Sequence, residues 1–454
     1  MSKDKVLIIG AGLAGSLLSI YLAKRGIAVD VFEARGDMRR EAVAAGRSIN
    51  LALSDRGIAA LREVGMDEYM LAEAVPMYGR MIHSVVGETK LLPYSGRPGE
   101  YINSVSRGGL NIALINEAER QGGVRFFFNE PSNGFDARTG EVFFSSGRTA
   151  TGTTVIATDG AGSAIRRSML DGGVSRFNFS QSWLDHGYKE LHIPPAEGAE
   201  KFRIDGRALH IWPRHKFMMI ALPNFDGSFT CTLFLAHKTG STDGFTTAEE
   251  ASFENLSDTS AVVRFFDREF PDAASLMPTL ADDFESNPTG NLGTVKCWPW
   301  NVGGRALLLG DSAHAIVPFY GQGMNCAFED VRLLDQLIEK LGTDWETVFE
   351  EYGRLRKINT DAIADMAEEN FYEMRNATAD PVFQRKRELE TRLENTFPNY
   401  FSKYSMVTFR EDLPYSAAKQ KGNAQDALLM EICSAVDNVK HLDIDSIHRR
   451  LQAL

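Results

Sequence analysis

A glycine-rich turn near the N-terminus constrains the fold of this chain more than any other feature. Gly10-Ala-Gly12-Leu-Ala-Gly15 follows an apolar stretch, residues 5–9, that predicts a short buried strand, and it precedes a helical pattern over residues 13–25. Residues 27–33 predict a second strand, which completes a βαβ unit. In this context Gly10 allows a tight turn, Gly12 lets a pyrophosphate approach the backbone, and Gly15 lets helix and strand pack closely. The sequence therefore predicts a dinucleotide-binding turn.

Residues next to this turn supply further expected contacts to a dinucleotide. The helix that begins at Leu13 offers unpaired N–H groups and a partial positive charge to phosphates. Glu33 ends the second strand, where its carboxylate can accept hydrogen bonds from the hydroxyls of an unphosphorylated adenosine ribose. Ala34 and Arg35 follow it as candidate cofactor contacts. A glycine-rich turn in an unrelated α/β protein is the alternative, and this motif alone does not separate FAD from NAD.

Composition and charge exclude several classes of protein. The chain has 454 residues, 43% of them hydrophobic and 24% charged, which is enough for a large core divided between two or more domains. The net charge of −12 argues against nucleic acid or an anionic membrane as a partner. Four widely spaced cysteines form no CxxC pair, so we expect a reducing, cytoplasmic setting. No apolar run reaches the roughly 18 residues of a membrane-spanning helix.

A second motif favours FAD over NAD. Residues 159–166, Asp-Gly-Ala-Gly-Ser-Ala-Ile-Arg, follow a predicted strand at residues 154–157 and resemble the DGxxSxxR motif of class A flavoprotein monooxygenases. Asp159 is the candidate cofactor contact in this motif. Arg166 is expected to neutralise a phosphate or to hold an acid in place. An ordinary surface arginine after a turn would look similar.

A third motif has the most specific pattern in the chain. Gly310-Asp311-Ser-Ala-His314, followed by Pro318, Gly321, Gly323, Asn325 and Asp330, resembles the GD(S/A)AH…P..GxGxN…D signature of the same enzymes. Asp311 follows a predicted strand, where its carboxylate can bond the ribityl arm of FAD. The loop would bring bare backbone to the flavin ring. The helix that starts near Met324 would direct its positive end at the anionic reduced flavin.

A metal site at His314 has to be considered, because this residue lies three positions after Asp311. The sequence shows no further ligand cluster around the pair, so we expect no metal and interpret His314 as a buried structural histidine. No HExxH or Ser-His-Asp arrangement is apparent. Since only one GxGxxG is present, a pyridine nucleotide is expected to dock transiently.

The distribution of these patterns predicts a mixed α/β fold with three regions. Residues 1–174 and 290–345 are expected to form a Rossmann-like FAD-binding domain, which includes part of the substrate lobe near residues 75–105. Alternating apolar and polar residues between 174 and 237 predict an antiparallel sheet, so residues 175–289 are assigned to an interleaved substrate domain. Residues 346–454 follow a helical pattern and are expected to close the active site.

Beyond the flavin motifs, the chain resembles the kynurenine 3-monooxygenases over most of its length. The densest matching segments are Gly46–Ser54, Gly79–His83, Leu92–Tyr94, Ser104–Arg107, Pro318–Asn325, Glu369–Met374 and Tyr404–Phe409. The resemblance implies noncovalent FAD, NADPH as co-substrate, and 3-hydroxylation of L-kynurenine by O2 through a flavin C4a-hydroperoxide. That reaction belongs to tryptophan degradation toward quinolinate and NAD biosynthesis. The flavin carries the chemistry, so no catalytic side chain is assigned.

The same resemblance implies the site residues. Its substrate contacts fall on an arginine, two tyrosines and an asparagine: Arg80, Tyr94, Tyr404 and Asn370. Glu373, Phe319 and Met374 join them as candidates, although Phe319 and Met374 would also suit the core. A planar guanidinium can clamp the amino-acid carboxylate in two places, and an acid one helical turn from the asparagine could meet the ammonium. The full cofactor set is Gly10, Gly12, Leu13, Gly15, Glu33, Ala34, Arg35, Ala52, Arg107, Asp159, Asp311, Gly323, Met324 and Asn325. Tyr320 departs from relatives that place His or Phe there.

Ordinary interpretations of the substrate residues stay open at this point. Arg80 would also suit a surface salt bridge, Tyr94 a turn, and Glu373 a solvated helix face. Two other functions remain: a related flavin hydroxylase in which Arg80 binds the ring carboxylate of another aromatic acid, and a non-catalytic FAD-fold binding protein. The glycine loop at 321–325 disfavours the second. A homodimer is the expected assembly, with neither membrane nor nucleic acid as a partner.

Overall fold

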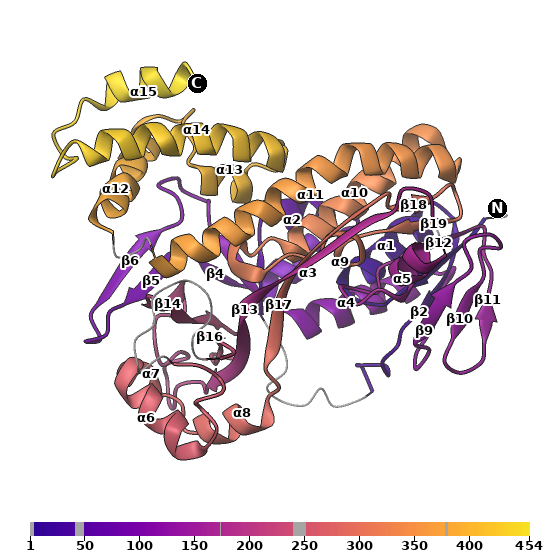
Figure 1. Cartoon of the computed structure of the whole chain (residues 1–454), viewed down its shortest axis with the longest axis horizontal. Coiled ribbons are helices and arrows are strands. Elements are labelled where there is room, and N and C mark those ends of the chain that lie inside the picture. Colours follow the sequence, from indigo (N-terminus) through magenta and orange to yellow (C-terminus); the bar gives the residue numbers. More distant parts are fainter. Residues whose placement is uncertain (1–3, 41–49, 173, 239–250, 377–379) are drawn as a thin grey trace.

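The computed structural model describes residues 4–172, 174–238, 251–376 and 380–454, apart from residues 41–49 and the side chains of residues 375 and 376. Two sheets lie side by side, and a layer of helices runs across them (Figure 1). The first sheet belongs to the N-terminal half with a return of the chain near residue 306, and the second is built from the middle of the chain. The expected mixed α/β fold is confirmed.

The first sheet contains the βαβ unit expected from the glycine turn. Its strand order is β18-β19-β12-β1-β2-β8, and every pairing is parallel except that of β18 with β19. The strands are β1 (Lys5–Ile9), β2 (Ala28–Phe32), β8 (Val124–Phe127), β12 (Thr154–Ala157), β18 (Asn301–Val302) and β19 (Ala306–Leu308). A parallel strand must be buried on both faces, which explains why nearly all of these residues are apolar.

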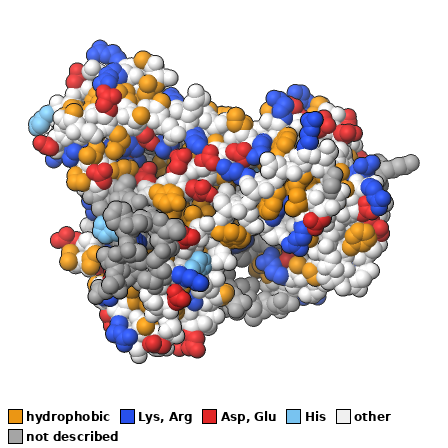
Figure 2. All heavy atoms as spheres, viewed as in Figure 1, with side chains coloured by type: hydrophobic (Ala, Val, Ile, Leu, Met, Phe, Trp, Pro, Cys, Tyr) orange, Lys and Arg blue, Asp and Glu red, His pale blue; other side chains and the backbone are white. Residues whose placement is uncertain are grey.

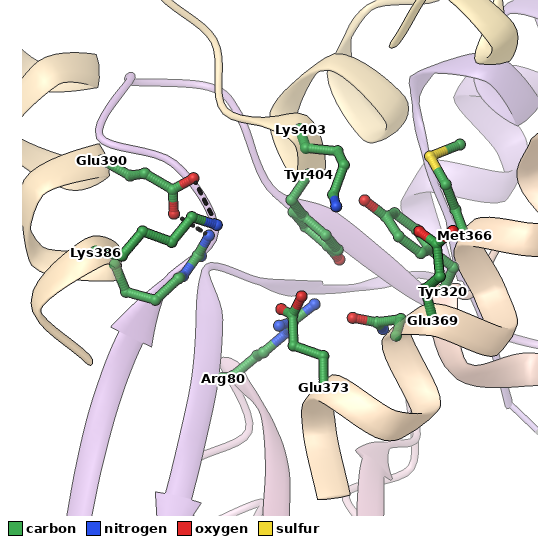
Figure 3. A pocket seen from close by; sticks show the side chains of 11 residues that line it. Arg80, Tyr320, Met366, Glu369, Glu373, Lys386, Glu390, Lys403 and Tyr404 are labelled. Atoms are coloured by element: carbon green, nitrogen blue, oxygen red, sulfur yellow. Dashed lines mark hydrogen bonds and ion pairs between the residues drawn. The ribbon is translucent and has the colours of Figure 1, made fainter. Parts of the chain in front are cut away.

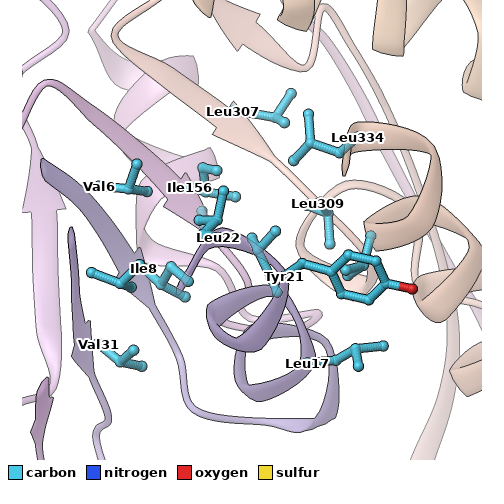
Figure 4. Close-up of a cluster of buried hydrophobic side chains, with 14 of the residues drawn as sticks. Val6, Ile8, Leu17, Tyr21, Leu22, Val31, Ile156, Leu307, Leu309 and Leu334 are labelled. Atoms are coloured by element: carbon cyan, nitrogen blue, oxygen red, sulfur yellow. The ribbon is translucent and has the colours of Figure 1, made fainter. Parts of the chain in front are cut away.

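Three helices pack together against this sheet: α1 (Leu13–Lys24), α4 (Arg107–Gln121) and α10 (Gly323–Leu341). Helix α1 contacts both of the others. Leucine, isoleucine and valine side chains from strands and helices interdigitate between them, as Figure 4 shows around Ile8, Leu22 and Leu334. This apolar layer fixes the glycine turn, because the turn joins β1 directly to α1. On another side, α5 (Ala164–Asp171) packs against a small sheet of β9 (Ser132–Phe135), β10 (Val142–Phe144) and β11 (Thr149–Ala150).

The second sheet has seven strands in the order β17-β13-β16-β15-β14-β5-β6, antiparallel except between β14 and β5. The strands are β5 (Gly79–His83), β6 (Thr89–Pro93), β13 (Asn178–Ile193), β14 (Ala208–Arg214), β15 (Phe217–Pro223), β16 (Phe229–Ala236) and β17 (Gly290–Trp298). The antiparallel sheet expected between residues 174 and 237 is present. The sheet also takes in β17, which lies past residue 289, and the strands near residues 79–93. Helices α6 (Thr259–Glu269), α7 (Pro271–Ala274) and α8 (Leu280–Ser286) bury an aromatic core against it.

A short sheet connects the two lobes. It consists of β3 (Asn50–Leu53), β7 (Ile102–Ser106) and β4 (Val75–Met77), and β3 leads directly into α2 (Asp55–Glu63), followed by α3 (Asp67–Ala72). Helix α2 packs against α10. Helix α2, which follows β3, therefore lies against the helix that precedes the C-terminal region.

The C-terminal region is helical, as the sequence predicts. After α9 (Asp311–His314), the 3-10 turn η1 (Pro318–Tyr320) and α10, it contains α11 (Trp345–Asn376), α12 (Pro381–Thr396), α13 (Lys403–Phe409), α14 (Tyr415–Ser434) and α15 (Ile444–Gln452). Helix α11 crosses from one lobe to the other (Figure 1). Within the described ranges, no helix is both long and apolar enough to cross a membrane. Acidic and basic side chains are interspersed over the face in Figure 2.

Candidate active site

The three glycines of the turn have distinct geometric roles. Gly10 has a φ of +104°, and a Cβ added to it would lie 2.5 Å from the carbonyl oxygen of Thr158. A Cβ on Gly15 would lie 2.0 Å from the carbonyl oxygen of Gly10. By contrast, a Cβ on Gly12 would meet nothing within 4 Å. Gly10 and Gly15 therefore close the turn, and Gly12 borders the open space that a pyrophosphate needs.

The carboxylate of Glu33 is held beside this turn. Its Oε2 accepts a hydrogen bond from the backbone N–H of Ala11 at 2.8 Å, and its Oε1 accepts from the backbone and the Nε of Arg35 at 3.0 and 2.8 Å. A carboxylate can accept about four hydrogen bonds. The buried side chain thus keeps capacity for a ribose hydroxyl, which fits the role expected from the sequence. Ala34 and Arg35 lie exposed next to it.

Asp159 lies beside the turn, and its Oδ2 accepts from the backbone N–H of Ala164, the first residue of α5, at 2.8 Å. Its Oδ1 is buried and has no hydrogen-bond partner among the described residues. Burial raises the pKa of Asp159 above its ordinary value. A buried, unpaired oxygen at the mouth of a dinucleotide turn fits a site that a polar cofactor group completes.

The guanidinium of Arg166 binds backbone carbonyl oxygens of two motifs. Its guanidinium donates to the carbonyl oxygen of Ser312 at 2.6 Å and to that of Ala161. It also lies over the ring of Phe179, with Cζ 4.9 Å from the centroid. Arg166 therefore fastens the second flavin motif to the third through backbone carbonyls, and its expected role toward a phosphate or an acid stays a prediction.

The third motif places its polar groups at the same edge of the first sheet. Asp311 follows β19 and is exposed, so its carboxylate is available to a ligand. Asn325 donates to the carbonyl oxygens of Ala52 at 2.8 Å and Gly321 at 2.9 Å, and its own oxygen accepts from the N–H of Ser54 at 3.0 Å. Asn325 therefore secures the glycine loop against β3.

The remaining cofactor candidates border this edge. Gly323 and Met324 are the first residues of α10, whose N-terminus carries no side-chain cap, so its N–H groups and positive dipole end are open to a ligand. Arg107 is exposed at the start of α4. Leu13 starts α1 and is half-buried. These positions fit a flavin dinucleotide laid along the carboxyl ends of the strands.

His314 is buried, as expected, but the expectation that no further ligands lie near it is wrong. Ligand atoms of His314, Cys326 and Asp330 lie within 4.8 Å of one another. Arg356 donates to Asp330 Oδ1 at 2.6 Å and to Cys326 Sγ at 3.2 Å, so a guanidinium occupies the place that a metal ion would need. Burial alone would raise the pKa of Asp330, yet His314 and Arg356 lower it below its ordinary value.

A pocket opens where the second sheet meets the C-terminal helices (Figure 3). Its lining residues come from β5, the turn η1 and helices α11, α12 and α13: Arg80, Tyr320, Met366, Glu369, Asn370, Glu373, Lys386, Arg387, Glu390, Lys403 and Tyr404. In Figure 3, the guanidinium of Arg80 and the carboxylate of Glu373 project into the space in front of Tyr404. The pocket lining thus contains basic and acidic side chains next to tyrosine rings.

Arg80 is held among tyrosine rings. Its Cζ lies 4.5 Å from the ring centroid of Tyr404 and 5.6 Å from that of Tyr94. Tyr404 stacks on Tyr94 and on Tyr320, with centroids 5.5 Å apart in both pairs. Burial raises the pKa of Tyr94 and of Tyr320, so both phenols stay protonated and can donate a hydrogen bond to an anion.

The other expected substrate residues lie in or directly behind the pocket wall. Asn370 donates to the carbonyl oxygen of Phe319 at 2.6 Å and contacts Met374 Sδ at 3.4 Å. The Phe319 ring packs between Phe234 and Phe371, with centroids 4.9 and 4.5 Å away. Arg80, Asn370, Glu373 and Tyr404 line the pocket, whereas Tyr94, Phe319 and Met374 support these side chains from behind.

Sequence reasoning missed the wall that α12 and its neighbours provide. Lys386 and Arg387 pair with Glu390 at 3.1 and 2.8 Å, and Lys403 precedes Tyr404 on α13. Because α12 is rich in charged residues, its sequence is typical of a solvated helix. Tyr320, noted only as a departure from relatives, proves to be part of the lining.

Comparison of the sequence with known proteins identifies a matching family model and similar proteins. The model of a family described as FAD binding domain matches residues 3–215 and 278–367. The kynurenine 3-monooxygenase of Myxococcus xanthus is 47% identical over 448 residues, which cover 97% of this chain and 93% of that protein. The Dictyostelium discoideum kynurenine 3-monooxygenase is 42% identical over 455 residues, with 97% and 95% covered.

Solved structures with this fold include a tetrameric form of 2-methyl-3-hydroxypyridine-5-carboxylic acid oxygenase. It has a TM-score of 0.66 and 18% identity, and the match covers 88% of this chain and 99% of that one. Klebsiella pneumoniae HpxO complexed with FAD and uric acid has a TM-score of 0.65 and 20% identity, with 85% and 93% covered. At these identities the likeness shows the fold.

Proposed function

This chain belongs to the kynurenine 3-monooxygenase family of FAD-dependent enzymes, and on that premise we propose that the pocket around Arg80 binds L-kynurenine. The proposed reaction uses NADPH and O2 and yields 3-hydroxykynurenine. The edge of the first sheet, from the glycine turn to the N-terminus of α10, is the proposed binding site of FAD and is called the cofactor edge below.

One observation carries the substrate assignment. Arg80 lines the pocket, and no carboxylate of the described residues lies within ion-pair distance of it. Two tyrosine rings cover its guanidinium instead. A cation that is partly removed from water and has no anionic partner in the protein is suited to bind the carboxylate of a ligand. The planar fork of arginine matches a carboxylate in two places.

The other pocket residues suit the α-ammonium group and the aromatic ring of such a ligand. Glu373 lies on α11 one turn from Asn370 and can accept hydrogen bonds from an α-ammonium. Tyr320, Met366 and the Phe319 layer offer apolar surface to a ring. Such a wall orients the ring and excludes water from it.

FAD, when bound, supplies the oxygen-transfer chemistry and takes its electrons from NADPH. Gly10, Gly12, Gly15, Glu33 and Asp311 would hold it, with Asn325 securing the loop at the flavin edge. The aniline ring of kynurenine is already electron-rich, so the reaction needs no side chain to deprotonate a phenol. The protein's own contribution is therefore binding, orientation and exclusion of water.

The test is turnover by the purified, FAD-loaded protein. L-Kynurenine should stimulate NADPH oxidation, and 3-hydroxykynurenine should accumulate in proportion, measured by chromatography with peroxide assayed in parallel. 4-Hydroxybenzoate and salicylate serve as comparison substrates. If either of these stimulates product formation and kynurenine does not, the pocket binds another aromatic acid. If no compound stimulates oxidation, the function as proposed is wrong.

We also propose a cytoplasmic location and a homodimeric assembly. All four cysteines are buried and free, as expected for a chain that folds in a reducing compartment. Fractionation of cells that produce the protein tests the location, and light scattering of the purified protein measures the mass of the assembly.

A further inference from the structure

The helix that carries Tyr404 is short and is held at both ends by side chains from other elements. Helix α13 has seven residues, and Ser402 caps its N-terminus. Glu394 of α12 accepts from the backbone N–H of Ser402 at 2.9 Å and from the hydroxyl of Ser405 at 2.6 Å. An acid at a helix N-terminus complements the helix dipole. A helix this short depends on such contacts, because its own hydrogen bonds stabilise it little.

Arg56 of α2 holds the other end. Its Nε donates to the carbonyl oxygen of Val407 at 2.8 Å, and its Nη2 donates to those of Arg410, at 2.9 Å, and Leu413. The last carbonyls of a helix lack partners within the helix, and a cation there matches the negative end of the dipole. The Arg56 side chain has no solvent exposure.

The charge of Arg56 is balanced independently of these carbonyls. Its Nη1 pairs with Glu329 at 3.0 Å, and the other oxygen of Glu329 pairs with Arg356 at 2.9 Å. The ring of Tyr415 lies 4.0 Å from its Cζ, and the Tyr415 hydroxyl donates to Gln322 in the glycine loop. Four of the five N–H groups of the guanidinium therefore have partners, and the side chain is fixed in one orientation.

We propose that Arg56 is a positioning residue for the substrate pocket and acts through Tyr404. Arg56 lies three residues after β3 in the segment whose backbone bonds Asn325, so it belongs to the cofactor side of the molecule. Its three carbonyl contacts set the end of α13, and α13 sets the Tyr404 ring over Arg80. Arg56 thereby fixes the positions of Arg80 and Tyr404 relative to the cofactor edge. This inference rests on the proposed function, because it concerns kynurenine affinity.

The first experiment compares Arg56→Lys and Arg56→Gln with Arg62→Lys. Lysine keeps the charge next to Glu329 but lacks the fork that reaches three carbonyls, and glutamine also removes the charge. Arg62 is the matched control, since it lies on the same helix with a side chain 61% exposed. We expect the kynurenine dissociation constant to rise about tenfold in Arg56→Lys and further in Arg56→Gln. FAD affinity should stay within about twofold, and Arg62→Lys should match the wild type.

A double-mutant cycle separates positioning from general loss of stability. If Arg56 acts through Tyr404, adding Arg56→Lys to Tyr404→Leu should change the dissociation constant by less than about twofold. A full tenfold effect in the Tyr404→Leu background would show that Arg56 acts by another route. Loss of FAD from both Arg56 variants would also contradict the proposal, because it predicts that the cofactor site is spared.

The controls distinguish failure of this inference from failure of the proposed function. A wild-type protein that does not bind kynurenine defeats the proposed function before any variant is compared. A wild-type protein that binds kynurenine, together with a folded Arg56→Lys variant of unchanged affinity, defeats this inference alone.

Discussion

The cofactor edge and the substrate pocket are built in opposite ways. In the glycine turn of the cofactor edge the constraints involve backbone: Gly10 approaches the carbonyl oxygen of Thr158, Gly15 approaches that of Gly10, and Gly12 leaves space open. In the substrate pocket most groups are charged or aromatic side chains from β5, η1, α11, α12 and α13, and β5 lies more than 200 residues before the others. The glycine turn depends on close approaches of backbone, and the pocket depends on packing of side chains between lobes.

This difference predicts that damage to the two sites should be separable. A change in the pocket should weaken kynurenine binding and leave the flavin in place. A change at the cofactor edge should release FAD from a pocket that is otherwise intact. Each substitution below should affect one site and spare the other.

The largest effect is expected for Arg80→Ala. Removing one side of a buried charge-assisted contact costs about 2–5 kcal/mol, so the kynurenine dissociation constant should rise by tens-fold or more. Arg80→Lys should recover part of the affinity, because lysine keeps the charge but not the planar fork. Kynurenine titrations followed by flavin absorbance measure both, with the flavin spectrum as folding control. Wild-type affinity in Arg80→Ala would refute the substrate assignment.

The matching change at the cofactor edge is Asp311→Ala. Loss of a charge-assisted hydrogen bond to the ribityl arm costs about 1.5–3 kcal/mol, so FAD should dissociate more readily. Kynurenine affinity of the fully FAD-saturated variant should remain near that of the wild type. Fluorescence of released FAD during dialysis gives the affinity. A folded variant that retains FAD as the wild type does would show that this carboxylate has been assigned wrongly.

A pair of glycine substitutions tests the role of the turn directly. Gly15→Ala places a Cβ 2.0 Å from a carbonyl oxygen, and such overpacking costs about 1–3 kcal/mol in folding. Gly12→Ala enters open space, so it should leave the melting temperature of the apoprotein unchanged and weaken FAD binding. Calorimetry of both apoproteins and FAD titrations compare them. Equal melting temperatures for the two variants would contradict the assigned roles.

The smallest effect is expected for Tyr94→Phe. Tyr94 supports Arg80 and Tyr404 from behind, so this change removes one neutral hydroxyl group, worth about 0.5–1.5 kcal/mol, while the stacked ring against Tyr404 remains. The kynurenine dissociation constant should rise up to about tenfold, with FAD affinity unaffected. Tyr69→Phe is a suitable control, since that tyrosine is 52% exposed. No change in Tyr94→Phe would mean that the hydroxyl of Tyr94 does not help to position Arg80.

The glycine turn of the cofactor edge could be predicted because its three glycines are close together in the sequence. A turn that needs a positive φ or a close backbone approach admits only glycine, so the spacing of Gly10, Gly12 and Gly15 already specifies its geometry. The resemblance also pointed to Arg80, Asn370, Glu373 and Tyr404, which the structure brings to one pocket. The expectation around His314 was less accurate, since it depended on partners far along the chain.

The sequence by itself determined the dinucleotide turn and the two kinds of sheet, because strand and helix periodicity and glycine geometry are local properties. The resemblance to a known family implied the chemical character of the ligands. Only the tertiary structure decided that α12 lines the pocket, that Arg356 fills the space beside His314, and that Arg56 clamps the helix of Tyr404. A charged side chain looks the same in sequence whether it faces water or pairs inside the protein. Its role is set by the elements that pack against it, and those come from distant parts of the chain.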